Sequence, residues 1–196
     1  YGIALCAPPY VTTDPTVSVA RLFNPGMKEN GAVFNHTQGW AVLAAVELGW
    51  TERAWEYLRN VMPASFNDRA EIREVEPYVV CQSTCSRFSP RYGAGRVSWL
   101  SGSAVWNYVA MTTGILGIRP DYAGLVVAPC IPAAWPGFTA TRRFRGCVFE
   151  IEVVRGDKRA MTVNGSPVAD TLIPAASFAA RNLVRVTLPR ASCGPA

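Results

Sequence analysis

The spacing of apolar residues changes along the chain, from a helical repeat in the first part to an alternation of two in the last part. Residues 37–48 are apolar on nearly every side of a helix, which predicts a helix buried between others and ended by Gly49. A second helix is expected to begin at the capping residue Thr51 and to stop at Pro63. Because so few residues join them, the two helices are predicted to form an antiparallel hairpin.

The next segment, residues 63–100, has no regular repeat. A loop of this length in a compact domain usually has a function, and its aromatic and β-branched residues argue against disorder. A third helix is predicted after Ser101, with apolar residues on one face and Gly117 at its end. Three buried helices joined by long loops suggest part of an α/α barrel.

At Ile118 the period of the pattern becomes that of strands. Residues 148–153 alternate in steps of two, as in a half-exposed strand, and Asn164-Gly165 is a strong hairpin signal. The predicted strands lie within residues 126–132, 138–144, 147–154, 160–168 and 184–189. From about residue 119 onward the chain is therefore expected to form an antiparallel β-sandwich.

Composition excludes several classes of protein. With 196 residues, of which 49% are hydrophobic and 17% charged, the chain is expected to fold into one or two globular domains. The longest apolar run, residues 40–50, is too short to span a bilayer and contains Glu47. No membrane is therefore expected as a partner. The formal charge of +5 is spread over scattered basic residues without interleaved aromatic side chains, so no nucleic acid partner is expected either.

The cysteines indicate the cellular compartment, and the first residues of the sequence indicate whether it is part of a longer polypeptide. The six cysteines lack a paired C-x-x-C pattern, which favours free thiols in a reducing cytoplasm. Cys81 and Cys85 could form half of a metal site, but no second Cys or His pair lies near them, so no metal is expected. The chain starts at Tyr1 without the features of a signal peptide, and we expect it to be a piece of a longer polypeptide.

The loop from 24 to 40 contains the densest group of polar residues. Lys28 lies between two glycines in this loop, where it could contact a ligand or form an ion pair with Glu29. His36 precedes an apolar helix, whose free N–H groups could help it bind an anion, although a lone histidine often has only a structural role. Ser101 and Gly102 stand at the start of another helix, as an ordinary cap or as an anion site.

Two further features lie in the irregular segment. Gln82 offers one acceptor and two donors, which suit sugar hydroxyls or a contact that ties the loop to itself. Glu71, Glu74 and Glu76 form a carboxylate cluster beside arginines, which could hold an acid catalyst or only ion pairs. From the residues alone we infer a fragment of a helical barrel with a polar pocket for an anion or a sugar.

Five separated blocks of the sequence carry a resemblance to a known family. They read N-P-G-M-K-E-N-G-A-V-F-N-H-T-Q-G-W, A-E-I-R-E-V-E-P-Y-V-V-C-Q-S-T, S-W-L-S-G-S-A-V-W, I-L-G-I-R-P-D-Y-A-G-L and P-C-I-P-A-A-W. In order and spacing they resemble the cellobiose phosphorylase family, the inverting disaccharide phosphorylases of glycoside hydrolase family 94. The resemblance extends over nearly the whole chain.

The resemblance implies an α+β multidomain architecture. Members of the family have an N-terminal β-sandwich, a helical linker, a six-hairpin α/α barrel and a C-terminal β-domain. Residues 1–118 are expected to form the C-terminal part of the (α/α)6 barrel and residues 119–196 an antiparallel β-sandwich. The missing upstream part of the same enzyme is therefore an expected partner, and a homodimer is common in the family.

The resemblance also implies roles for individual residues. His36, Ser101 and the backbone of Gly102 are expected to bind phosphate, with Ser101 where many relatives have threonine. Lys28 and Gln82 are expected to contact the transferred glucosyl unit. Arg21 lies in the segment that shapes the site of the leaving sugar, where it could favour an acidic acceptor such as gluconate.

The implied reaction is phosphorolysis of cellobiose or a related β-linked disaccharide to α-glucose 1-phosphate and the acceptor sugar. Inorganic phosphate attacks the anomeric carbon, and no cofactor is needed. The family's general-acid aspartate lies upstream of this sequence, so the chain alone is expected to be inactive. Three alternatives stay open: a cellobionic-acid-type phosphorylase, a fragment that binds sugar or phosphate without turnover, and an inverting hydrolase.

Overall fold

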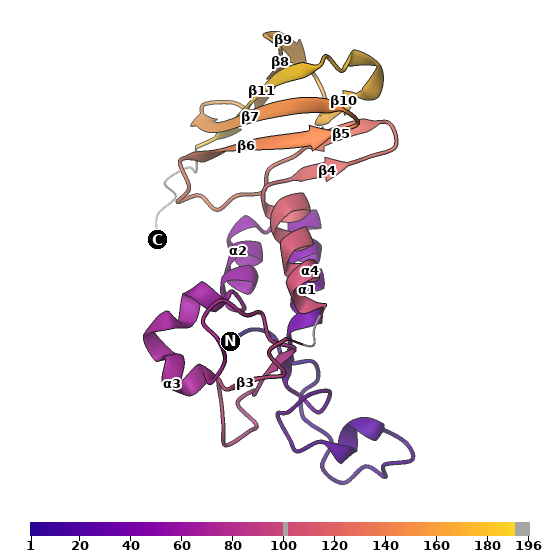
Figure 1. Ribbon diagram of the computed structural model, residues 1–196, viewed down its shortest axis with the longest axis vertical. Helices are drawn as coiled ribbons and strands as arrows, with labels where there is room; N and C mark the ends of the chain where they lie inside the picture. The colour runs from indigo at the N-terminus through magenta and orange to yellow at the C-terminus, as the bar shows by residue number, and fades with distance from the viewer. Residues whose placement is uncertain (100–101, 191–196) are drawn as a thin grey trace. The chain divides into compact units, whose positions relative to one another are not determined.

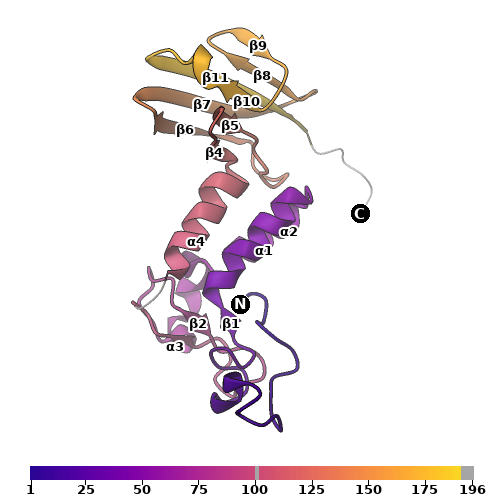
Figure 2. The ribbon, with the colours of Figure 1, turned by 90° about the vertical axis from the view of Figure 1, so that its right-hand side faces the viewer.

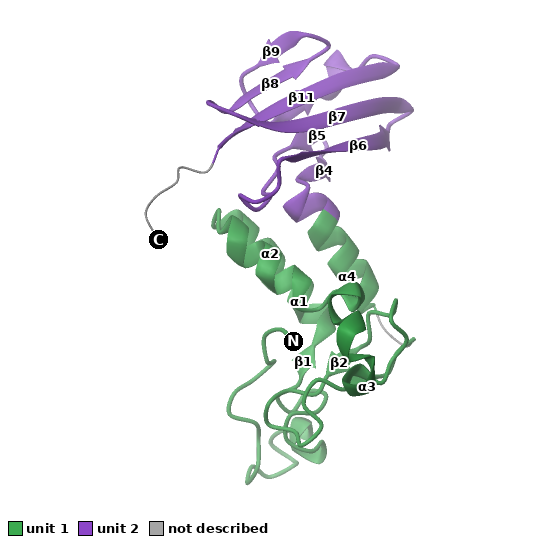
Figure 3. Cartoon of the chain, turned by 90° about the vertical axis from the view of Figure 1, so that its left-hand side faces the viewer, with its two compact units in different colours: residues 1–111 green, residues 112–196 purple. Residues whose placement is uncertain are grey.

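The computed structural model describes residues 1–99 and 102–190 (Figure 1). The chain divides into two compact units, Tyr1–Met111 and Thr112–Ala196, which are described separately (Figure 3). Helices dominate the first unit and strands the second, so the expected mixed α+β class is confirmed. The domain division after residue 118 stays a prediction. Among the helices of the described residues, none combines the length and the apolar composition needed to cross a membrane.

The first two predicted helices are present and pack against each other. Helix α1 (Asn35–Glu47) begins two residues earlier than expected. Helix α2 (Thr51–Arg59) has Trp50 at its N-cap, so Thr51, the predicted cap, is instead its first residue. Gly49 has a φ of +70°, the left-handed conformation that glycine adopts readily after a helix. Helix α2 ends before Pro63, which instead opens the 3-10 helix Pro63–Arg69.

Helix α1 is not buried on nearly every side, contrary to the prediction. Val42 is fully buried, whereas the side chain of Trp40 is 51% exposed and that of Leu48 is 60% exposed. Within the described residues, the helices that pack on α1 are α2 and α4, and they leave these two side chains exposed. An apolar helix buries its whole surface only when neighbours surround it.

The third predicted helix is also present. Helix α4 (Ser103–Val109) continues as a π-helical segment, Ala110–Ile115, and lies beside α1 (Figure 2). Gly39 permits this approach, because a Cβ at Gly39 would lie 2.7 Å from the carbonyl oxygen of Trp106. The close contact between the two helices brings their N-terminal ends together.

The segment predicted to be irregular contains short regular elements. Helix α3 (Ala70–Arg73) follows the 3-10 helix. Strand β2 (Ser83–Thr84) pairs with β1 (Val33–Phe34) on one side and with β3 (Gly95–Arg96) on the other, in an antiparallel sheet. Sequence pattern missed this sheet because strands of two residues are too short to show an alternation. The sheet links the start of α1 to a segment that lies far away in the sequence.

The second unit contains two sheets. The three-stranded sheet has the order β10-β5-β4 and contains β4 (Ile118–Pro120), β5 (Gly124–Val127) and β10 (Leu172–Pro174). The five-stranded sheet has the order β6-β7-β11-β8-β9. Its strands are β6 (Gly137–Phe144), β7 (Cys147–Gly156), β8 (Ala160–Val163), β9 (Ser166–Val168) and β11 (Arg181–Pro189).

The expectation of a wholly antiparallel β-domain is wrong for one pair of strands. Strands β7 and β11 run parallel, with Val184 opposite Ile151. The chain passes through β8, β9 and β10 before it returns to β7, and such a long connection allows a parallel pair. An alternation of side chains is the same in both strand directions, so it could not reveal this pairing.

The predicted hairpin is confirmed. Asn164 and Gly165 join β8 to β9 with φ values of +51° and +82°, as a two-residue turn of this sequence requires. The backbone N–H of Asn164 donates to the carbonyl of Leu183, and the Asn164 Oδ1 accepts from the Leu183 N–H. The turn is thereby held against strand β11.

Strands β7 and β11 share one buried and one polar face. The buried face consists of Phe149, Ile151, Val153, Val184, Val186 and Leu188. On the opposite face, Glu150 pairs with Arg181 and Glu152 with Arg185, each at 2.6 Å. Burial of the apolar face supplies most of the stabilisation, because exposed ion pairs contribute little.

Phe149→Ala tests the core of the second unit. The ring is fully buried and lies 4.8 Å from the Phe178 ring between centroids, so its loss should lower the free energy of unfolding by about 3–5 kcal/mol. Leu183→Ala, on the neighbouring strand and 54% exposed, should change it by less than about 0.5 kcal/mol. Urea denaturation of the complete chain measures both, and equal effects would contradict this assignment of the core.

Candidate functional site

Helix α1 follows strand β1 directly, and His36 is the second residue of this helix. No side chain caps this helix at Phe34, so its first N–H groups carry a positive partial charge. The Phe34 ring stacks on the imidazole of His36, with 5.6 Å between centroids and 24° between planes. This stacking restricts the orientation of the imidazole at the end of the helix.

The start of α4 meets His36. The Ser103 Oγ lies 3.2 Å from the His36 Nδ1, within hydrogen-bond distance. A Cβ at Gly102 would lie 2.9 Å from the His36 Nε2, so the imidazole occupies the space in which a side chain would stand. The structure thus brings His36 and Gly102 together, and their role in binding phosphate stays a prediction. Ser101 lies outside the described residues.

Gln82 lies next to the same helix end. Its carbonyl accepts from the Asn35 N–H at 2.8 Å, and its own N–H donates to the Val97 carbonyl at 3.0 Å. The Gln82 Oε1 is buried, and within the described residues it has no hydrogen-bond donor. Buried acceptors are normally satisfied, so this oxygen lacks a donor that the described residues do not supply.

Lys28 belongs to a tightly folded loop beside this region. The buried side chain of Asn30 accepts from the Tyr10 N–H and donates to the Tyr10 and Phe23 carbonyls. The Gly26 carbonyl accepts from the Ser86 N–H at 3.0 Å, which ties the loop to the segment after β2. The Lys28 Nζ lies 5.2 Å from the centroid of the Phe23 ring.

The structure does not join every predicted residue to His36. Arg21 is half-buried in the 3-10 helix Val19–Leu22. Within the described residues, no hydrogen bond, ion pair or ring contact connects Arg21 or Lys28 to His36, Gly102 or Gln82. The roles of Arg21 and Lys28 therefore stay predictions.

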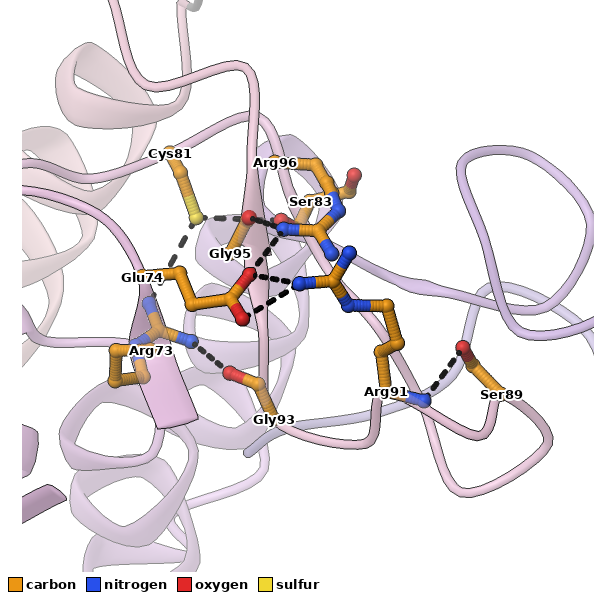
Figure 4. Close-up of polar contacts among 9 residues, drawn as sticks. All are labelled: Arg73, Glu74, Cys81, Ser83, Ser89, Arg91, Gly93, Gly95 and Arg96. Carbon is orange, nitrogen blue, oxygen red and sulfur yellow. Dashed lines mark hydrogen bonds and ion pairs between the residues drawn. The ribbon is translucent and has the colours of Figure 1, made fainter. Parts of the chain in front are cut away.

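The carboxylate cluster consists of ion pairs and hydrogen bonds. Both carboxylate oxygens of Glu74 lie 2.6 Å from the Arg91 Nη2, and Oε2 lies 3.0 Å from the Arg96 Nη1 (Figure 4). These contacts, Arg91 first, hold the pKa of Glu74 below its ordinary value. The pKa of Glu76 is also lowered, by a backbone hydrogen bond and by the Trp99 indole N–H. A general acid needs a raised pKa, so ion pairing explains this cluster better.

Residues 1–99 and 102–190 contain no group of three or more His, Cys, Asp or Glu side chains that could hold a metal ion. The five cysteines of this part of the chain are free thiols. Cys81 and Cys85 are both buried in the first unit.

Sequence reasoning missed several polar residues around the site. Asn107 is buried in α4 and donates to the carbonyls of Asn35 (3.2 Å) and Ser103 (2.8 Å). Asn35 donates to the Cys81 carbonyl at 2.8 Å. An asparagine within an otherwise apolar helix was a signal for Asn107. No pattern indicated that Asn35 and Cys81 would meet.

The arrangement can bind an anion beside a ligand that carries hydroxyl groups. The uncapped start of α1, the imidazole and the backbone at Gly102 converge on one point. The unpartnered Gln82 Oε1 adds an acceptor on the neighbouring segment.

Comparison with known proteins gives a consistent result. Residues 1–117 match the model of the catalytic domain of the glycosyl hydrolase 94 superfamily. The chain is 36% identical over 191 residues to an N,N'-diacetylchitobiose phosphorylase of Vibrio proteolyticus. This alignment covers 95% of this chain and 24% of the relative. It is 38% identical over 173 residues to the protein of the same name from Vibrio furnissii, in an alignment that covers 86% of this chain and 22% of the relative.

A third relative is named for another substrate. The chain is 30% identical over 186 residues to a cellobionic acid phosphorylase of Neurospora crassa, covering 89% of this chain and 22% of the relative. The chain thus spans about a quarter of the length of each of these three curated relatives.

Glu74→Gln tests the ion-pair reading of the cluster. Because Arg91 and Arg96 lower the folded-state pKa of Glu74, its stabilising effect is present above its ordinary value of 4.5 and is lost as the pH falls through the lowered folded value. Glu74→Gln should therefore be less stable than wild type at pH 7, and the difference in stability should be smaller at pH 3. Urea denaturation at both pH values checks this.

The control for Glu74 is Glu71→Gln, at an exposed carboxylate three residues earlier in the same cluster. This change should leave stability nearly unchanged at both pH values. A difference between wild type and Glu74→Gln that persists undiminished at pH 3 would contradict the ion-pair reading.

Proposed function

The chain belongs to the glycosyl hydrolase 94 superfamily, and from this premise we propose that it is the C-terminal portion of an inverting disaccharide phosphorylase. The complete enzyme would cleave a β-linked disaccharide with inorganic phosphate, giving an α-sugar 1-phosphate and the acceptor sugar. The convergence of His36, Gly102 and the uncapped start of α1 carries the proposal, since it forms an anion site beside an acceptor for sugar hydroxyls.

His36, Gly102 and Ser101 are the proposed phosphate ligands. The imidazole and the backbone N–H groups would donate charge-assisted hydrogen bonds to the phosphate oxygens, which stabilise the dianion as it approaches the anomeric carbon. Phosphate is itself the nucleophile, so no protein base is required. It would attack from the face opposite the leaving sugar, and the configuration is inverted.

Protonation of the departing oxygen requires a carboxylic acid. The resemblance implies that this acid is an aspartate upstream of the present sequence. In the irregular segment, Glu74 and Glu76 have lowered pKa values and are engaged by Arg91, Arg96 and Trp99. We therefore propose that the 196-residue chain alone has no phosphorylase activity.

The two units are proposed to correspond to parts of the family's architecture. Residues 1–118 would be the last part of the α/α barrel, and residues 119–196 the C-terminal β-sandwich. The exposed side chains of Trp40 and Leu48 support this, because the remaining helices of a barrel would cover such a face. The upstream part of the enzyme is therefore the proposed partner of the first unit.

Gln82 and Lys28 are the proposed contacts to the transferred sugar. The buried, unpartnered Gln82 Oε1 supports the role of Gln82. Cellobiose is the first donor to test. N,N'-diacetylchitobiose is the second, because the two relatives at 36% and 38% identity are named for it.

An acidic acceptor such as gluconate is the other candidate, with Arg21 as its contact. The relative named for cellobionic acid, at 30% identity, favours testing it. An inverting hydrolase on the same barrel would instead need a second carboxylate to activate water. A fragment that only binds sugar or phosphate would lack the upstream acid.

Phosphate dependence separates these functions. The complete enzyme should release an α-sugar 1-phosphate from cellobiose or N,N'-diacetylchitobiose only when inorganic phosphate is present, as anion-exchange chromatography of the products would show. Release of free sugars without phosphate would support the hydrolase. No product from either disaccharide or from cellobionic acid would favour binding without turnover.

Gly102→Ala tests the phosphate site. The new methyl group would lie 2.9 Å from the His36 Nε2 and displace the imidazole, so the KM for phosphate should rise at least about tenfold. Val105→Ala, at a residue 64% exposed on the same helix, should leave it unchanged. Steady-state kinetics of the complete enzyme measures both, and an unaltered phosphate KM in Gly102→Ala would refute this site.

A further inference from the structure

Arg73 is a buried cation with no carboxylate partner in the described structure. Its side chain is 5% exposed, and none of the ion pairs within residues 1–99 and 102–190 includes it. Its Nη1 donates to the Thr84 Oγ1 at 2.9 Å and to the Gly93 carbonyl at 3.2 Å. Its guanidinium carbon lies 5.0 Å from the centroid of the Phe66 ring. Hydrogen bonds and an aromatic face thus satisfy this charge.

The thiol of Cys81 connects Arg73 to the start of helix α1. Its Sγ lies 3.7 Å from the Arg73 Nη2, and it donates to the Ser83 carbonyl at 3.2 Å (Figure 4). It also lies 3.4 Å from the Asn35 Nδ2. Cys81 is fully buried, and a Cβ at Gly95 would lie 3.1 Å from its sulfur. The thiol therefore fills a closely packed space between two donors.

Two of these three residues, Asn35 and Cys81, adjoin a proposed ligand-binding residue in the sequence. Asn35 immediately precedes His36, and Cys81 immediately precedes Gln82. The Asn35 N–H also donates to the Gln82 carbonyl, so the two segments are joined by backbone as well as side-chain contacts. A shift of the Cys81 thiol would therefore move both His36 and Gln82.

We propose that Arg73 and Cys81 are positioning residues, which act through Asn35 to hold His36 and Gln82 at a fixed separation. This inference rests on the proposed function, in which His36 contacts phosphate and Gln82 the sugar. Phosphate must approach the anomeric carbon within a narrow range of distance and angle, so a displacement of about 1 Å between the two contacts is costly. Neither residue touches a reactant.

The burial of Arg73 is itself an argument for this role. An unpaired charge in the interior is expensive, and an apolar side chain of similar volume often stabilises a protein as well or better. A cation that donates to Thr84, Gly93 and Cys81 at once gains directional contacts that an apolar residue lacks. Those directions determine the geometry of β2 and of Gln82, which precedes it.

The test uses four variants of the complete enzyme. Arg73→Met and Cys81→Ala remove the polar contacts, whereas Arg73→Lys and Cys81→Ser keep part of them. We expect kcat/KM for phosphate to fall about 10- to 100-fold in the first pair, with a raised phosphate KM, and to recover partly in the second pair. Loss of stability alone would lower the active fraction and hence kcat, and would leave the KM unchanged.

Arg69 and Cys85 provide matched controls for Arg73 and Cys81. Arg69 also faces the Phe66 ring, at 5.9 Å, but it is exposed and pairs with Asp68, so Arg69→Met should retain wild-type kinetics. Cys85 is 1% exposed and its thiol has no hydrogen bond within the described residues, so Cys85→Ala should also retain them.

Hydrogen exchange gives a readout that does not depend on the reaction. The amides of Asn35 and Gln82 should exchange at least about tenfold faster in Arg73→Met and Cys81→Ala, while the Ala54 amide in α2 stays protected. Wild-type kinetics together with unchanged exchange at both amides in these variants would overturn the positioning role. If the wild-type enzyme shows no phosphate-dependent cleavage, the proposed function fails, and the exchange rates alone decide the positioning role.

Discussion

The hydrogen bond from the Asn35 N–H to the Gln82 carbonyl is the contact on which the first unit depends. It joins the beginning of helix α1 to the segment that leads into β2, two regions far apart in the sequence. The pairing of β1 with β2 and the Asn35 contacts to Cys81 reinforce it. This contact uses the first amide of α1, next to His36.

The second constraint is the close approach of α1 and α4. Gly39 has no side chain where Trp106 passes, and Asn107 donates to backbone carbonyls at the start of both helices. Two helix ends are thereby held together, and the imidazole fills the space above Gly102. The proposed site for an anion thus depends on how closely two helices pack, and not on the identity of one residue.

The helical repeats and the Asn164-Gly165 turn were predictable because their causes are local. Apolar spacing and a turn that favours positive φ act within a few residues. The sheet of β1, β2 and β3 and the parallel pairing of β7 with β11 could not be predicted in this way. Strands of two residues show no period, and an alternation of side chains carries no direction. The exposed side of α1 was likewise invisible in a pattern that shows only that a helix is apolar.

The sequence by itself determined the family, the helices α1, α2 and α4, the strands of the five-stranded sheet and the candidates His36, Gly102 and Gln82. Only the tertiary structure decided which of these candidates meet, that Glu74 pairs with Arg91 and Arg96, and that Arg73 and Cys81 lie behind the site. The physical reason is that residue type and spacing record local preference and chemical capacity. Contacts between distant segments arise from packing and backbone pairing, which no single stretch of sequence contains.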